Sequence, residues 1–270
     1  MVARTLGVAA GAGARVTVTF VAGVFGLVIG SFLNVVVYRV PRGLSVVQPG
    51  SFCPACGTPI RSSDNVPVIS WLVLRAKCRH CREPISPRYP TVEILTGALF
   101  AALAWVLGAH WAVPGMCALG ATALALAVVE LDGLPPPGAV SLIGTGIGAV
   151  ALGAVAVADR RWWHLGGMLI GIGAASCVGV AGSWAARRRG ATVSLWALIP
   201  GGAVMGWVGA PGTVVGVAGT AVVLVGSWIF LGDRRRQDGS GPNVGLACAG
   251  LLGAGAALIS AFVAGSSIGV

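Results

Sequence analysis

Charged residues are scarce in this chain. Only 10% of its 270 residues are charged, whereas an ordinary soluble domain carries roughly 25%. Hydrophobic residues make up 56% of the sequence, which is more apolar surface than a soluble core can absorb. The composition therefore excludes an ordinary soluble domain and favours a protein whose length forms membrane spans.

Acidic residues are scarcer still. Eight acidic residues stand against 18 basic ones, and the formal net charge is +10. A nucleic-acid-binding protein would spread such an excess over a water-exposed face, but here the basic residues lie between apolar runs. We therefore expect membrane lipid, and no nucleic acid, as a partner of these charges. No glycine-rich segment follows a strand, so a nucleotide-binding fingerprint is not supported.

Apolar runs long enough to cross about 30 Å of hydrocarbon recur along the chain. They predict an all-α, polytopic transmembrane bundle of seven or eight helices, with the count depending on a break at residues 208–212. The first run has no clear signal-peptide cleavage site, and we expect it to be a retained span. The predicted spans are residues 16–38, 92–109, 112–131, 138–158, 164–185, 193–209, 211–231 and 244–268.

The basic residues also predict the orientation of the bundle. Placing residues 39–90 in the cytoplasm leaves only Arg4, Arg15, Arg160 and Arg161 on the outside, as the excess of Lys and Arg on cytoplasmic loops requires. We expect three parts: a transmembrane helix over 1–38, a cytoplasmic loop over 39–90 and a transmembrane bundle over 91–270.

Four cysteines lie in the predicted cytoplasmic loop as two CxxC pairs separated by 21 residues. This spacing is close to that of zinc ribbons, in which two turns place four thiolates around one Zn²⁺. So small a segment has few apolar residues of its own, and a metal would hold its shape. The predicted zinc ligands are Cys53, Cys56, Cys78 and Cys81. The alternatives are a pair of redox disulfides, or His80 as a ligand.

The segments around these cysteines resemble the opening of one enzyme family. Residues 30–34 read GSFLN, and residues 38–43 read YRVPRG. DNVPVISWL follows at 64–72 and PISPRYP at 84–90. In this order the motifs are similar to those of the prepilin leader peptidase/N-methyltransferase family over about 70 residues. GPNVGLA at 241–247 also resembles the start of the family's last helix.

The resemblance implies a function at the cytoplasmic face of the inner membrane. Members of the family are polytopic enzymes that remove the basic leader from type IV pilin and type II secretion pseudopilin precursors. Many then methylate the new N-terminus with S-adenosylmethionine. The resemblance thus implies an aspartic-type protease and methyltransferase, with prepilins or pseudopilins as partners and S-adenosylmethionine as a cofactor beside zinc.

The sequence departs from the family at the catalytic acids. Aspartic proteolysis needs two carboxylates that share a proton, and the family's first motif, which ends in Leu-Pro-Asp, falls at residues 130–136, ELDGLPP. Glu130 or Asp132 then supplies the first carboxylate; the other interpretation is an exposed loop acid. Ser194 stands at the family's second Asp, and no carboxylate lies between residues 160 and 232.

These departures leave three functional hypotheses. The leading one is a prepilin peptidase family protein with Glu130 and Asp132 as its acidic site. The second is a catalytically inactive member that acts as a pilin-binding or assembly protein. The third is a member that retains only methyl transfer.

Overall fold

The structure, a computed structural model, describes residues 12–187 together with Pro200 and Ala203. The described residues form helices and no strand, so the expected all-α class is confirmed. In chain order the elements are α1 (Ala12–Arg39), η1 (Val40–Arg42), η2 (Ser62–Asp64), α2 (Ile69–Val73), α3 (Arg88–Leu107), α4 (Ala112–Leu131), α5 (Gly138–Ala158) and α6 (Trp162–Arg187).

Four of these helices are long and apolar enough to cross a membrane. They are α1 with its 3-10 extension, α3, α4 and α5, and α6 covers the expected run at 164–185. The expected spans at 211–231 and 244–268, and nearly all of 193–209, lie outside the described residues. The count of seven or eight helices therefore stays a prediction.

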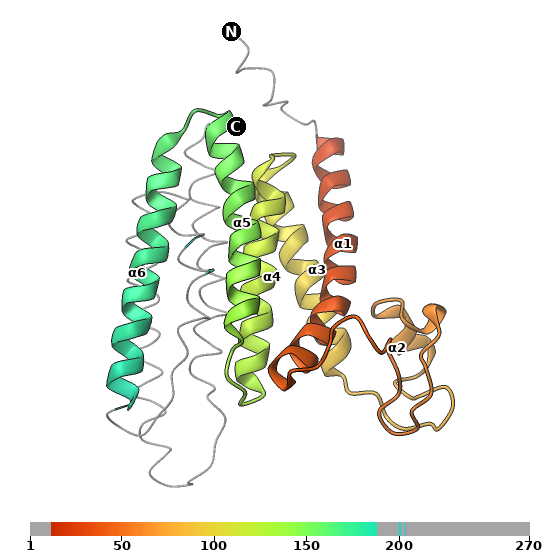
Figure 1. Ribbon diagram of the computed structural model, residues 1–270. Helices are drawn as coiled ribbons and strands as arrows, with labels where there is room; N and C mark the ends of the chain where they lie inside the picture. The colour runs from red at the N-terminus through yellow and green to blue at the C-terminus, as the bar shows by residue number, and fades with distance from the viewer. Residues whose placement is uncertain (1–11, 188–199, 201–202, 204–270) are drawn as a thin grey trace, which may run out of the picture.

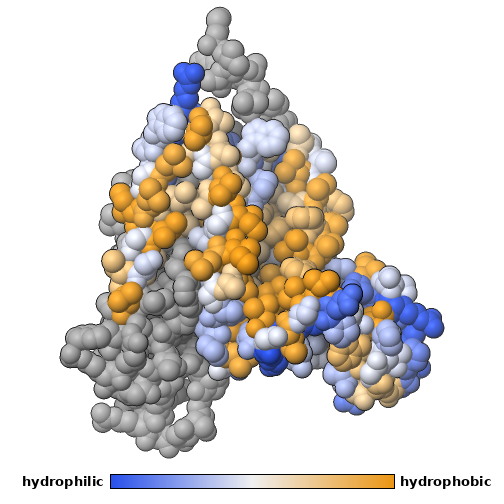
Figure 2. All heavy atoms as spheres, in the orientation of Figure 1, coloured by the Kyte–Doolittle hydropathy of each residue, from blue (hydrophilic) through white to orange (hydrophobic). Residues whose placement is uncertain are grey.

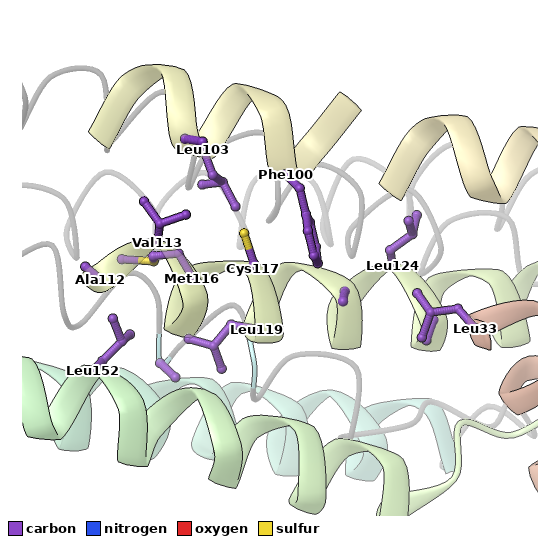
Figure 3. Close-up of a cluster of buried hydrophobic side chains, with 14 of the residues drawn as sticks. Leu33, Phe100, Leu103, Ala112, Val113, Met116, Cys117, Leu119, Leu124 and Leu152 are labelled. Atoms are coloured by element: carbon purple, nitrogen blue, oxygen red, sulfur yellow. The ribbon is translucent and has the colours of Figure 1, made fainter. Parts of the chain in front are cut away.

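The long helices lie side by side and alternate in direction (Figure 1). The segment between α1 and α3 forms a separate small unit beside one end of the bundle, and the α4–α5 connection lies at that same end. Of the four candidate spans, α4 is the most enclosed: 83% of the residues in its 18-residue apolar stretch are buried, against 22% for α1. Its side chains meet those of α1, α3 and α5 in one apolar core (Figure 3).

Two glycines bring α1 and α3 into backbone contact. A Cβ added at Gly26 would lie 2.8 Å from Gly97 Cα, and one added at Gly30 would lie 2.7 Å from Glu93 Cα. Real Cβ atoms do not approach backbone so closely, and small residues at such points are typical of helix pairs in membranes. The close approach fixes the height of α3 relative to α1.

The outer face of α1 is strongly apolar and exposed. Its exposed side chains include Phe20, Val24, Phe25, Val28 and Phe32. Figure 2 shows hydrophobic surface over the bundle and hydrophilic surface on the loop beside it. Soluble monomers rarely expose so large a continuous apolar area. Together with the four apolar helices, this surface identifies a membrane protein.

The contact at Gly30 gives a test of the packing. Gly30→Ala places a methyl group against the α3 backbone, and we expect a loss of about 1–3 kcal/mol of stability from overpacking. Gly146→Ala on α5 is the matched control, because nothing lies within 4 Å of its added Cβ. Thermal unfolding of the two purified variants in detergent measures the difference. Equal midpoints for Gly30→Ala and Gly146→Ala would contradict the close α1–α3 contact.

Candidate functional site: the cysteine cluster and the acids at its end of the bundle

Each CxxC pair forms a tight turn, and the second turn repeats the first. In both, the residue after the second cysteine has a positive φ: +70° at Gly57 and +63° at Arg82. Each turn is closed by an isolated β-bridge, Phe52 with Pro59 and Lys77 with Pro84. The hydrogen bonds that close the turns are Gly57 N–H to Cys53 O, Arg82 N–H to Cys78 O, Cys53 N–H to Thr58 O and Cys78 N–H to Glu83 O.

The two turns bring their four sulfur atoms together. All four Sγ atoms lie within 4.8 Å of one another, and those of Cys53 and Cys81 are 3.8 Å apart. Cys53 is buried, and Cys56 and Cys81 are exposed. None of the described cysteines forms a disulfide. The cluster therefore has the donor set and the geometry to hold a metal ion.

The surroundings of Cys56, Cys78 and Cys81 give these three thiols different pKa values. Thr58, through its side chain and its backbone, lowers the pKa of Cys56 to about 6. Backbone hydrogen bonds from Cys81 and His80 lower the pKa of Cys78. At Cys81 a backbone hydrogen bond from Glu83 acts in the same direction, but partial desolvation and hydrogen bonds with the three neighbouring thiols raise its pKa to about 12. The cluster thus favours thiolates at some positions and retains protons at others, and a bound metal would displace those protons.

An ion pair joins the second turn to the segment between the two turns. Arg79 donates two hydrogen bonds to Asp64, from Nε at 2.7 Å and from Nη2 at 2.6 Å. The guanidinium of Arg79 lowers the pKa of Asp64 below its ordinary value. A two-point Arg–carboxylate pair fixes orientation as well as distance, so it holds η2 against the second turn.

Polar contacts attach this loop to the bundle at the ends of α1 and α3. The backbone N–H of Val68 in the loop donates to Glu93 Oε2 on α3 at 2.7 Å. Beside it, Asn34 Nδ2 on α1 donates to the carbonyl of Tyr89 at 3.1 Å and joins α1 to the first turn of α3. Both Glu93 and Asn34 are buried. The sequence analysis assigned no role to Glu93. The feature that could have indicated one is its place as a lone acid at the start of an apolar run.

The two predicted acids lie at the end of α4 in different surroundings. Glu130 is 4% exposed in the last turn of the helix, and its Oε2 has no hydrogen-bond partner among the described residues. Asp132 caps the helix and is partly exposed. Gly133, with φ +71°, then turns the chain away. Ser194, the third residue of interest, lies outside the described residues.

Asp132 has a partner that sequence reasoning missed. Its Oδ2 lies 2.7 Å from Nη2 of Arg88, the first residue of α3. Arg88 belongs to the PISPRYP motif at the end of the cysteine loop, and the sequence alone indicates only a positive charge on the cytoplasmic side. No local pattern predicts a contact between residues so far apart in sequence. The pair joins the loop's C-terminal end to the acidic end of α4.

Comparison with known proteins places this arrangement in a family. The family model of the Bacterial Peptidase A24 N-terminal domain matches residues 24–107, which run from α1 through the cysteine loop to the end of α3. No solved structure matches the chain significantly.

Three curated relatives of the chain carry the same name. The "Prepilin leader peptidase/N-methyltransferase" of Neisseria gonorrhoeae is 39% identical over 135 residues, covering 41% of this chain and 47% of the relative. That of Myxococcus xanthus is 48% identical over 109 residues, covering 40% of this chain and 32% of the relative. The chain thus spans less than half the length of these two relatives. The protein of that name from Burkholderia pseudomallei is 32% identical over 252 residues, covering 76% of this chain and 75% of the relative. At that identity and coverage, the chain belongs to the prepilin leader peptidase/N-methyltransferase family.

Proposed function

We propose that the protein removes the leader peptides of type IV pilin-like or type II secretion pseudopilin precursors. The names of the three relatives support prepilins as the substrate class. None of the relatives named above is described as a non-catalytic pilin-binding protein. The reaction is hydrolysis of one peptide bond at the end of a basic leader, carried out where α3, α4 and the cysteine loop meet.

The ion pair between Arg88 and Asp132 is the observation that carries this proposal. It joins the segment that matches the family's N-terminal domain to the carboxylate at the end of α4. A carboxylate that is partly exposed to water can accept a proton from an attacking water molecule. The guanidinium holds that carboxylate in one position, and 22% of the Asp132 side chain stays exposed.

Glu130 is the proposed second acid. It lies two residues before Asp132 and is buried, so the two carboxyl groups have the unequal surroundings that separate acid from base in such pairs. In the proposed reaction, water attacks the scissile carbonyl carbon while Asp132 takes a water proton and Glu130 protonates the carbonyl oxygen, which gives a tetrahedral intermediate. Asp132 then passes its proton to the amide nitrogen as the C–N bond breaks, and Glu130 takes back the hydroxyl proton as the new carboxyl group forms. Because Ser194 stands at the position of the family's second Asp and has no carboxylate, the two acids at the end of α4 carry out this reaction.

We propose that the cysteine loop holds a structural zinc ion. A tetrahedral Zn²⁺ with Zn–S bonds near 2.3 Å separates its sulfurs by about 3.8 Å, the distance found between Cys53 and Cys81. Four thiolates leave no open position for water, which is typical of structural and not catalytic zinc. The proposed ligands are Cys53, Cys56, Cys78 and Cys81. A bound zinc ion would supply a rigid link between the two turns.

We further propose an orientation of the chain in the membrane and a second activity, N-methyl transfer. The loop over 39–90 would face the cytoplasm from the inner membrane, between a first helix over 1–38 and a bundle over 91–270. Arg39, Arg42 and Arg88 lie at the loop's end of the bundle, as the positive-inside rule requires. The relatives' name also includes N-methyl transfer, for which S-adenosylmethionine would be the donor. We assign no described residue to that step.

Coexpression with a prepilin that carries a Gly-Phe junction tests the peptidase. We expect a product of mature size, and Asp132→Asn should slow its appearance about 10²-fold or more because the base is lost. Asp159→Asn is the matched control: this carboxylate lies at the opposite end of the bundle and should leave cleavage unchanged. A precursor that stays uncut by the wild-type, metal-loaded protein would overturn the proposal.

Metal analysis of the purified protein tests the proposed zinc site. We expect about one zinc ion per chain, and its loss in Cys53→Ser or Cys78→Ser, because three thiolates bind the ion far more weakly than four. Cys117→Ala, in the core of the bundle, is the control and should retain the zinc. Metal-free wild-type protein whose four loop thiols are all freely alkylated would refute a zinc site.

A further inference from the structure

The short helix α2 has its apolar side facing outward. Ile69, Leu72 and Val73 are 60%, 60% and 69% exposed, and their spacing of three and four residues places them on one helical face. Ser70 is instead buried: its Oγ donates to Ser63 O and accepts from the Val66 N–H. A surface helix of a soluble protein buries its apolar side chains and exposes its polar ones, and α2 does the opposite. Its exposed face is therefore expected to contact an apolar partner.

The depth of this helix is fixed by its attachment to α3. Val68, the residue before α2, donates its N–H to Glu93 at 2.7 Å. Glu93 lies five residues into α3, which is about 7.5 Å along the helix from Arg88 at 1.5 Å per residue. Helical side chains lean toward the N-terminus, so the carboxylate reaches back toward the arginine end. Helix α2 therefore begins between the charged end of the bundle and its apolar band.

The C-terminal end of α2 is also held in place. Trp71 Nε1 donates to the carbonyl of Ile85 at 3.1 Å, and Ile85 N–H donates to Ala76 O at 2.7 Å. Because Ile85 precedes α3 by three residues, these bonds keep α2 beside the start of that helix. These bonds therefore fix the position of the exposed face of α2 along α3, so this face does not lie at the tip of a mobile loop.

Basic side chains follow the apolar face directly. Arg75 and Ala76 have positive φ values of 52° and 57°, so the chain turns sharply after α2. Arg75 and Lys77 are exposed, and neither forms an ion pair with another described residue. An apolar face followed by cations is the pattern of helices that lie in the surface of an anionic membrane.

We infer that α2 is a membrane-interface anchor of the cysteine loop. Ile69, Leu72 and Val73 enter the boundary between headgroups and acyl chains, and Arg75 and Lys77 contact the phosphates of anionic lipid. The loop then has two attachments to the membrane region, one through Glu93 and one through lipid. This inference does not depend on whether the chain cleaves a substrate.

Photocrosslinking in nanodiscs tests the inference. The purified full chain, with p-benzoylphenylalanine at Leu72, is placed in bilayers of phosphatidylglycerol and phosphatidylethanolamine and irradiated, and adducts are identified by mass spectrometry. We expect a phospholipid adduct at position 72. The same probe at Glu83, an exposed charged residue of the second turn, is the control and should give no lipid adduct above background. A probe at Val73 repeats the test if the Leu72 variant loses its metal.

Three results would overturn the inference. The first is the absence of a lipid adduct at both Leu72 and Val73. The second is an adduct with a second copy of the chain in place of lipid, which would make the face a self-association surface. The third is loss of the lipid adduct when a prepilin with an apolar N-terminal segment is added, which would assign the face to substrate.

Discussion

The hydrogen bond between the Val68 N–H and the Glu93 carboxylate holds the cysteine loop on the membrane bundle. Val68 has a φ of +60°, a conformation that costs a β-branched residue of order 1–3 kcal/mol and persists because its surroundings enforce it. Glu93 can take this role only because Gly30 lets α1 and α3 meet at its Cα. The same attachment sets the height of α2, the proposed lipid contact, and the start of α3, where Arg88 reaches Asp132.

Much of the fold was predictable from the sequence. The expected spans at 112–131 and 138–158 coincide with α4 and α5, because Pro and charged residues end those apolar runs sharply. The first helix begins earlier than expected, at Ala12, since Ala12, Ala14 and Arg15 are good helix formers although they add little to the apolar run. Helix α2 was not predicted: five residues carry too little periodicity to be recognised.

The candidate site was predictable only where its signal is local. The CxxC spacing predicted that four sulfurs meet, and the structure places them within 4.8 Å of one another. The partners of Asp132, Val68 and Asp64 come from distant segments or different helices, and no single-sequence pattern encodes such pairs. Glu130 and Asp132 lie in different surroundings, one buried and one at the exposed helix end, and the sequence does not indicate which of the two is buried. Their catalytic use stays a prediction.

The Glu93 carboxylate thus anchors the loop to α3. Hydrogen–deuterium exchange of the full chain in nanodiscs tests this anchor most directly, by comparing the wild type with Glu93→Leu and Glu93→Gln. We expect faster exchange over residues 66–72 in Glu93→Leu, a smaller change in Glu93→Gln, whose amide oxygen can still accept the Val68 N–H, and unchanged exchange in α4 and α5. Identical exchange over residues 66–72 in the wild type and Glu93→Leu would show that the Glu93 carboxylate does not hold the loop.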